Sequence, residues 1–137
     1  MLTIFEKPNT LLRLEGLGVF ALALAVYCHQ SPNWGLFWST VWLPDLALLG
    51  YLANPGIGAV AYNITHAKLL PCTLALVGLV SGHALLLSLA LVWFMHIGVD
   101  RLLGYGLKYP EGFKITHLGV IGQVSNAAFG RFMPCHR

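Results

Sequence analysis

Four long apolar stretches follow one another along the chain with only short turns between them, and this pattern restricts the fold more than any other feature. The stretches cover residues 11–28, 34–52, 57–80 and 83–107. A helix needs about 20 residues to cross a hydrocarbon core of about 30 Å. Only 9% of the residues are charged, whereas soluble chains carry about a quarter, so we expect lipid to surround most of this chain. The sequence therefore predicts an all-α membrane protein.

The turns between these stretches predict how the helices are arranged. Residues 30–33, 54–56 and 81–82 consist mainly of Pro, Gly, Asn and Ser. Connections this short make consecutive helices antiparallel. We therefore expect four antiparallel transmembrane helices that form one bundle within residues 1–110.

The last part of the chain has a different pattern. From Phe113 onward, apolar residues recur every three or four positions, which is the spacing of one face of a helix. Residues 111–137 are therefore predicted to form a cytoplasmic tail, with a C-terminal amphipathic helix that lies on the membrane interface.

With antiparallel threading, all charged residues map to one face of the membrane. The eight Lys and Arg residues and the five Asp and Glu residues all fall on this side, whereas the two opposite turns, 30–33 and 81–82, contain none. The positive-inside rule then places both termini in the cytoplasm. The net charge of +3 suits such a basic membrane face, and the sequence has no pattern typical of nucleic-acid binding.

The first apolar stretch has an alternative interpretation. Lys7 and Arg13 stand beside an apolar run that contains ALALA, as in a cleaved secretory signal. A polar mature domain should follow such a signal. Three further apolar stretches follow instead, which favours a membrane span.

Five ionisable residues are predicted to lie at a similar depth below the cytoplasmic surface. They fall about 6 to 15 Å from the ends of their helices at about 1.5 Å of rise per residue, and they are Glu15, Asp45, His66, His96 and Asp100. His96 and Asp100 also share a helix face, because they are four residues apart. Ionisable groups inside a membrane are costly, and they usually pair with one another or mark a functional site.

Two prolines are predicted to distort helices close to these groups. Pro44 lacks the N–H that would pair with the carbonyl of Thr40, and Pro71 does the same for Ala67. Distorted helices beside polar residues are common where a membrane protein lines a cavity. The prolines are therefore consistent with a cavity at this depth.

Two imidazoles and up to three carboxylates at one depth suit a divalent metal such as zinc, iron or manganese. Soluble four-helix metalloproteins build their sites from inward His and carboxylate side chains in the same way. The predicted metal ligands are His66, His96, Asp45 and Asp100, with Glu15 as the catalytic base. A metal with an open position for water suits a hydrolase of a lipid or another amphiphile. Further predicted binding residues are Asn63, Arg101, Lys108 and His117.

Two other interpretations fit the same residues. The charged groups can form an internal network of ion pairs in a non-enzymatic accessory subunit of a larger membrane complex, and the small size of the chain favours this function. His66 and His96 can instead be the two axial ligands of a haem, although the neighbouring carboxylates disfavour an apolar porphyrin pocket. Whether the protein is an enzyme therefore stays open at this level.

Four segments of the chain resemble one known family. They are RLEG (13–16), LPDLALLGY (43–51), YNITH (62–66) and HIGVDRLLGYGLKYPEGFKITHLG (96–119). Together they resemble a family of small bacterial integral-membrane proteins that is named as a domain of unknown function, number 4260, over about residues 11 to 122. The resemblance implies a four-helix fold with several spans in the bacterial inner membrane, and it implies no activity.

Overall fold

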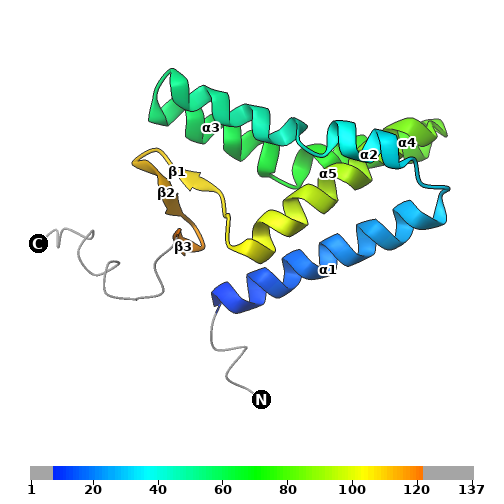
Figure 1. The fold of residues 1–137 in the computed structure, drawn as a ribbon, viewed down its shortest axis with the longest axis horizontal. Helices are drawn as coiled ribbons and strands as arrows, with labels where there is room; N and C mark the ends of the chain where they lie inside the picture. The colour runs from blue at the N-terminus through cyan, green and yellow to red at the C-terminus, as the bar shows by residue number, and fades with distance from the viewer. Residues whose placement is uncertain (1–7, 122–137) are drawn as a thin grey trace, which may run out of the picture.

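The computed structural model describes residues 8–121, and most of these are helical (Figure 1). The helices are α1 (Pro8–His29), α2 (Trp34–Thr40), the 3-10 helix η2 (Leu43–Leu52), α3 (Pro55–His66), α4 (Leu69–Ser81) and α5 (Ala84–Leu103). An antiparallel sheet comes next in the chain, in the order β1 (Lys108–Tyr109), β2 (Gly112–Thr116) and β3 (Gly119–Val120). Figure 1 shows α1 and α5 side by side, with the sheet next to α3.

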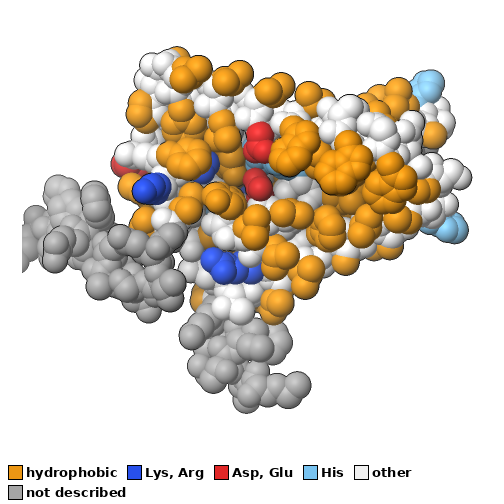
Figure 2. Space-filling model, in the orientation of Figure 1, with side chains coloured by type: hydrophobic (Ala, Val, Ile, Leu, Met, Phe, Trp, Pro, Cys, Tyr) orange, Lys and Arg blue, Asp and Glu red, His pale blue; other side chains and the backbone are white. Residues whose placement is uncertain are grey.

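Three helical segments of the described chain are long and apolar enough to cross a membrane. They are α1, the segment Pro55–Ser81 that contains both α3 and α4, and α5. They correspond to the predicted stretches 11–28, 57–80 and 83–107. Figure 2 shows a face that is covered mostly by hydrophobic side chains, with charged side chains in its left half and centre and histidines at its right end. The protein is therefore mostly helical and has the character of a membrane protein.

The second predicted span, residues 34–52, is not one continuous helix, so four antiparallel transmembrane helices are not confirmed. Helix α2 ends at Thr40, and the 3-10 helix η2 begins at Leu43. Pro44 explains the break, because it lacks the N–H that would bond to the carbonyl four residues earlier. Helix α2 therefore ends at Thr40, the residue whose carbonyl would need the missing N–H of Pro44.

The third predicted span is interrupted in the same way. Helix α3 ends at His66 and α4 begins at Leu69, with Ala67 in an extended conformation (φ −77°, ψ 139°). If the helix continued, the ring of Pro71 would clash with the carbonyl of Ala67, four residues earlier. A histidine therefore stands at the end of a half-helix inside the apolar segment 55–81.

The prediction of an amphipathic helix from residue 113 onward is wrong for the described residues 113–121, since they contain most of β2 and all of β3. Tyr109 pairs with Gly112 across the two residues Pro110 and Glu111. Proline with a glycine two positions later is the pattern of a type I turn, and the β-branched residues of β2 favour a strand. Residues 122–137 of the predicted tail lie outside the described residues.

Helix α5 contacts α1, α2 and α4. The buried core between α1 and α5 consists of Ala23, Tyr27, Leu91, Val92 and Met95. Nearer the sheet the two helices touch through glycines. A Cβ atom at Gly16 would lie 2.8 Å from the backbone oxygen of Gly98 and 2.9 Å from the backbone nitrogen of Leu102. The absence of side chains at these positions therefore lets the two backbones approach each other.

Replacing Gly16 by alanine is expected to destabilise the protein by about 1 to 3 kcal/mol, because the new methyl group would overlap backbone atoms that cannot move aside. The matched control is Gly18→Ala, two residues further along α1, where an added Cβ meets nothing within 4 Å. Alanine at this control position should be neutral or slightly stabilising, since alanine favours helices. Unfolding in detergent, monitored by circular dichroism, measures both variants. Equal stability of the two would contradict the close packing of α1 on α5.

Candidate metal centre

Four side chains from three separate elements converge at one point. Asp45 comes from η2, His66 is the last residue of α3, and both His96 and Asp100 lie on α5. One ligand atom of each lies within 4.8 Å of the others. The two histidines are buried, whereas the side chains of Asp100 and Asp45 are 18% and 37% exposed. A group of two imidazoles and two carboxylates in this arrangement can hold a metal ion.

The two histidine nitrogens lie 3.2 to 3.7 Å from each other and from one oxygen of each carboxylate. His66 Nε2 lies 3.2 Å from His96 Nε2. The same atom lies 3.5 Å from Asp45 Oδ1 and 3.2 Å from Asp100 Oδ2. His96 Nε2 lies 3.4 Å and 3.7 Å from the same two oxygens. Atoms bound at about 2.0 to 2.2 Å to a tetrahedral metal lie about 3.3 to 3.6 Å from one another. The five distances that involve a histidine are close to this spacing, and all four ligand atoms lie within 4.8 Å of one another.

The hydrogen bonds of His66 leave its Nε2 lone pair directed at this point. Its Nδ1 lies 3.0 Å from the backbone oxygen of Tyr62, which can only accept. The Thr65 hydroxyl, 2.9 Å from the same nitrogen, has backbone oxygens to donate to, among them that of Pro44 at 3.2 Å. Nδ1 therefore carries the proton of the neutral ring. Donation from Nδ1 to a backbone carbonyl is the usual arrangement for a histidine that binds metal through Nε2.

The end of α3 is held by donors from α5. The Trp93 indole N–H donates to the Thr65 backbone oxygen at 2.7 Å, and the Arg101 guanidinium donates to the His66 backbone oxygen at 3.4 Å. Carbonyls at a helix C-terminus lack partners within the helix, so these two donors replace the missing turn. The negative end of the helix dipole also favours a cation beside His66. Half-helices that end inside a membrane line ion sites in transporters in the same way.

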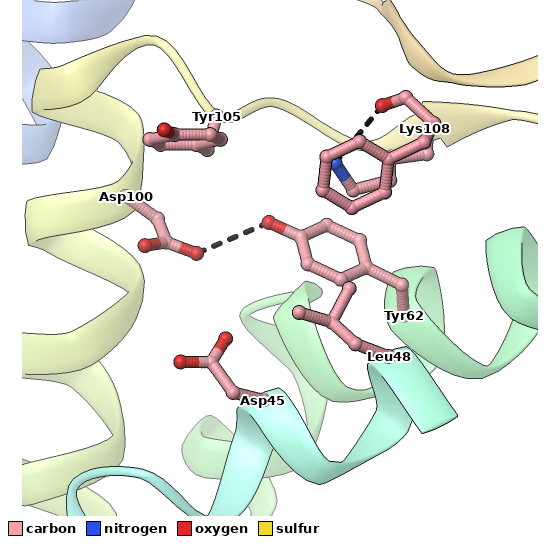
Figure 3. Close-up of a pocket in the computed structure, with 7 residues that line it drawn as sticks. Asp45, Leu48, Tyr62, Asp100, Tyr105 and Lys108 are labelled. Atoms are coloured by element: carbon pink, nitrogen blue, oxygen red, sulfur yellow. Dashed lines mark hydrogen bonds between the residues drawn. The ribbon is translucent and has the colours of Figure 1, made fainter. Parts of the chain in front are cut away.

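A cavity of about 290 Å³ opens beside the two carboxylates (Figure 3). Its lining residues are Asp45, Leu48, Tyr62, Asp100, Tyr105, Lys108 and Phe113. The Tyr62 hydroxyl donates a hydrogen bond of 3.1 Å to Asp100 Oδ2, which Figure 3 draws as a dashed line. The Tyr62 ring stacks on the His66 ring, with centroids 3.7 Å apart and planes 11° apart. Tyr62 therefore links the wall of the cavity to two of the four ligand residues.

Lys108 places a buried ammonium group on the wall of this cavity, across from Asp45 in Figure 3. Only 3% of the residue is exposed. Its Nζ donates to the backbone oxygen of Phe113 at 3.1 Å, and it lies 3.6 Å from the centre of the Phe113 ring. Burial lowers the pKa of Lys108, while the carboxylates of Asp100 and Asp45 oppose that shift. The cavity therefore has carboxylates on one side and a cation on another.

Asn63 fixes the strand that carries Lys108. Its Oδ1 accepts the Lys108 backbone N–H at 2.6 Å, and its Nδ2 donates to the Lys108 backbone oxygen at 2.8 Å. Because Asn63 precedes His66 by three residues on α3, one helix positions both a candidate metal ligand and a wall of the cavity. Asn63 was predicted as a binding residue, and here its amide binds the backbone of the protein itself.

Arg101 and His117 contact each other beside the site and do not line the described cavity. Arg101 Nη1 lies 3.0 Å from His117 Nε2, and the Leu107 backbone N–H donates to His117 Nδ1 at 2.8 Å. Burial, together with the nearby Arg101 guanidinium, lowers the pKa of His117. The neutral form of His117 is therefore favoured, and it ties the end of β2 to the segment after α5.

The structure brings the four predicted ligands together, but it does not bring Glu15 to them. Glu15 is exposed on α1, and the group of converging ligand atoms does not include it. Its neighbour Gly16 packs on α5, and consecutive residues of a helix point about 100° apart. Glu15 is therefore turned away from that contact, and its role as a base stays a prediction.

Sequence reasoning missed the aromatic lining of the cavity. A signal for Tyr62 was present, because it lies four residues before His66 and so shares its helix face. No such signal marked Tyr105 or Phe113, which lie after α5 in a turn and a strand that the sequence analysis did not predict. Because the sheet was not predicted, the burial of Lys108 on β1 was not predicted either.

The comparisons with known proteins give one result. The profile of a family described as Domain of unknown function (DUF4260) matches residues 9–121, a range that includes the four ligand residues and every residue lining the cavity. No curated protein and no solved structure matches the chain. Because the profile covers most of the sequence, the chain belongs to the DUF4260 family.

Proposed function

We propose that this protein is a membrane-embedded, metal-dependent hydrolase that acts on a lipid or another amphiphile at the cytoplasmic side of the bacterial inner membrane. The observation that carries the proposal is the convergence of one ligand atom each from Asp45, His66, His96 and Asp100, all within 4.8 Å of one another. The cavity beside the two carboxylates supports a substrate site, and the apolar helices support a site in the membrane. The proposal includes the predicted orientation, with both termini in the cytoplasm.

Zinc is the metal that we propose. Imidazole nitrogens and carboxylate oxygens both suit Zn²⁺, and zinc prefers the tetrahedral arrangement. Magnesium, calcium and manganese prefer oxygen ligands, so the two imidazole nitrogens among the four ligand residues favour zinc over these ions.

Four protein ligands complete a tetrahedron, so a substrate needs either a fifth position on the metal or a ligand that moves. Zinc accepts a fifth ligand in some catalytic steps. Asp45 is the ligand that we propose to move, because its side chain is 37% exposed and borders the cavity. It also belongs to a 3-10 helix, whose hydrogen-bond geometry is poorer than that of an α-helix.

A metal held by Asp45, His66, His96 and Asp100 would polarise a carbonyl or phosphoryl oxygen of the substrate and would make water more acidic. In the hydrolysis, the hydroxyl of water adds to the acyl or phosphoryl centre, the bond to the alcohol breaks, and the alcohol leaves with the proton. Asp45, which borders the cavity, would be the base that takes this proton from water. Tyr62 keeps Asp100 in place through its hydrogen bond.

Metal analysis of the detergent-purified protein tests the proposal. We expect about one zinc ion per chain in the wild type, and a fall to background in His96→Ala, because a zinc site depends on each of its few ligands. The matched control is His83→Ala at the other end of α5, where the residue is the N-cap and is exposed. This control should keep its zinc. Zinc that stays bound in His96→Ala would rule out the proposed ligand set.

The number of protein ligands also favours a second function. Zinc with four protein ligands is usually structural, and an ion that joins η2, α3 and α5 suits a non-enzymatic accessory subunit of a larger membrane complex. Replacement of zinc by Co²⁺ separates the two functions. A visible spectrum that changes when an ester amphiphile is added supports the hydrolase. An unchanged spectrum, in a protein that purifies together with other membrane subunits, supports the accessory function.

The geometry argues against the haem interpretation. The two axial nitrogens of a haem lie on opposite faces of the porphyrin, about 4 Å apart. The two Nε2 atoms of His66 and His96 are only 3.2 Å apart, and Asp45 Oδ1 lies within 3.5 Å of both. A porphyrin plane has no space between them.

A further inference from the structure

The ammonium group of Lys108 forms no ion pair in the part of the chain that the structure describes. Its hydrogen bond goes to a neutral acceptor, the Phe113 carbonyl. The ion pairs of residues 8–121 join only histidines to the two aspartates of the metal centre. A charged group that is 3% exposed is costly to bury without a partner of opposite charge. The group is therefore available to pair with an anion.

The charges around the cavity favour an anion once a metal is bound. A divalent ion neutralises the carboxylates of Asp45 and Asp100, which leaves Lys108 as an uncompensated positive charge on the cavity wall. A negatively charged oxygen is a strong ligand for both groups, since it forms charge-assisted hydrogen bonds with ammonium and coordinates zinc. Lys108 and the two carboxylates that would hold the metal line the same cavity, so a ligand in this cavity is next to both.

The aromatic rings around Lys108 do not favour a cationic ligand. The ring centres of Phe113, Tyr62 and Tyr105 lie 3.6, 4.5 and 5.9 Å from its Nζ. Such a cage of rings attracts cations, but Lys108 already occupies it. A quaternary ammonium headgroup would find these rings taken and would meet a like charge.

The size of the cavity limits the ligand to a headgroup. A volume of about 290 Å³ is at the lower end for small-molecule sites, and it leaves no space for acyl chains. The cavity residue Leu48 lies on η2 between Leu46 and Leu49, which are 58% and 62% exposed. These leucines form an apolar surface beside the cavity, where the tail of an amphiphile can remain in lipid.

We propose that the cavity binds an anionic oxygen group, a phosphate or carboxylate at the head of an amphiphile, with one oxygen on the metal and another on the Lys108 ammonium. The proposal rests on the metal centre of the proposed function and adds the substrate class to it. Lys108 is then the residue that selects anionic over neutral and cationic amphiphiles.

Binding of decyl phosphate to the full chain in detergent tests the proposal. Isothermal titration calorimetry should detect binding to the zinc-loaded wild type, and Lys108→Met should weaken it by about 10- to 100-fold through loss of a charge-assisted bond. Lys114→Met is the matched control, because Lys114 is an exposed lysine on β2, and its binding should be unchanged. An equal loss in both variants would overturn the proposal, since the attraction would then be a general surface effect.

Two further probes define the ligand. Decyl phosphate that binds more tightly than inorganic phosphate assigns the site to an amphiphile, and equal affinities assign it to free phosphate; either result supports an anion site. Decyltrimethylammonium that binds as tightly as decyl phosphate contradicts it. This comparison uses the wild type, so it remains decisive even if Lys108→Met does not fold.

The same experiment separates this inference from the metal centre. Wild-type protein that contains zinc but does not bind decyl phosphate refutes the anion site and leaves the metal centre intact. Wild-type protein that takes up no zinc refutes the metal centre itself, and with it the anion site.

Discussion

Removal of the metal with EDTA is expected to lower the free energy of unfolding by about 4 kcal/mol, if free zinc had been present at about 1,000 times its dissociation constant. The ligand residues belong to η2, α3 and α5, so an ion bound by them would crosslink three elements. Without an ion, Asp45 Oδ1 and Asp100 Oδ2 lie 3.5 and 3.2 Å from His66 Nε2 and are joined to it only by these weaker contacts. Thermal unfolding in detergent with and without EDTA, monitored by circular dichroism, measures the shift.

The double variant Asp45→Asn, Asp100→Asn is the control for this experiment. It lacks both carboxylate ligands, so we expect it to bind no zinc and to unfold at the same temperature with and without EDTA. An EDTA effect of equal size in both proteins would mean that the stabilising ion binds elsewhere.

The convergence of Asp45, His66, His96 and Asp100 could be predicted from the sequence. The helical repeat puts His96 and Asp100 on one face, and counting residues from the ends of the apolar stretches gave His66 and Asp45 a similar depth. Depth, however, says nothing about direction around a helix axis. Glu15 has the right depth, but the packing of Gly16 on α5 decides which way α1 is turned, and this contact is not encoded in local periodicity.

The positions of the helix breaks could also be predicted, but the conformation of the chain beyond each break could not. A proline always affects the carbonyl four residues earlier, so Pro44 and Pro71 define where α2 and α3 stop. After the second break the chain resumes as the α-helix α4, whereas after the first it forms the 3-10 helix η2 against α3. Both segments are apolar, so the difference depends on tertiary packing and not on composition.

The spacing of apolar residues could not predict the sheet or the burial of Lys108. The turn formed by Pro110 and Gly112 competes with the helical spacing after Phe113, and the turn prevails. Lys108 is buried because its backbone bonds to Asn63, 45 residues earlier in the chain. A contact over that separation has no signature in a short sequence window.

Replacement of Asn63 by leucine is expected to detach the strand that carries Lys108 and to cost about 2 to 4 kcal/mol of stability, since each unpaired backbone group costs about 1 to 3 kcal/mol. Leucine has a similar volume but no polar atoms, so the Lys108 N–H and C=O lose bonds of 2.6 and 2.8 Å. Both bonds are only part-buried, which places the cost below the maximum. Hydrogen exchange measured by mass spectrometry should show faster exchange in residues 105–118.

Asn54→Leu is the matched control, because Asn54 caps the other end of α3 and accepts the Ile57 N–H at 2.8 Å. Loss of this cap should cost about 1 kcal/mol and leave exchange in residues 105–118 unchanged. Faster exchange there in both variants would mean that α3 had loosened as a whole and that the Asn63 amide does not hold the sheet. Because the ammonium of Lys108 depends on the position of its backbone, Asn63→Leu should also weaken decyl phosphate binding about as much as Lys108→Met. Its zinc content should stay full, since none of the four metal ligands bonds to Asn63 through its side chain.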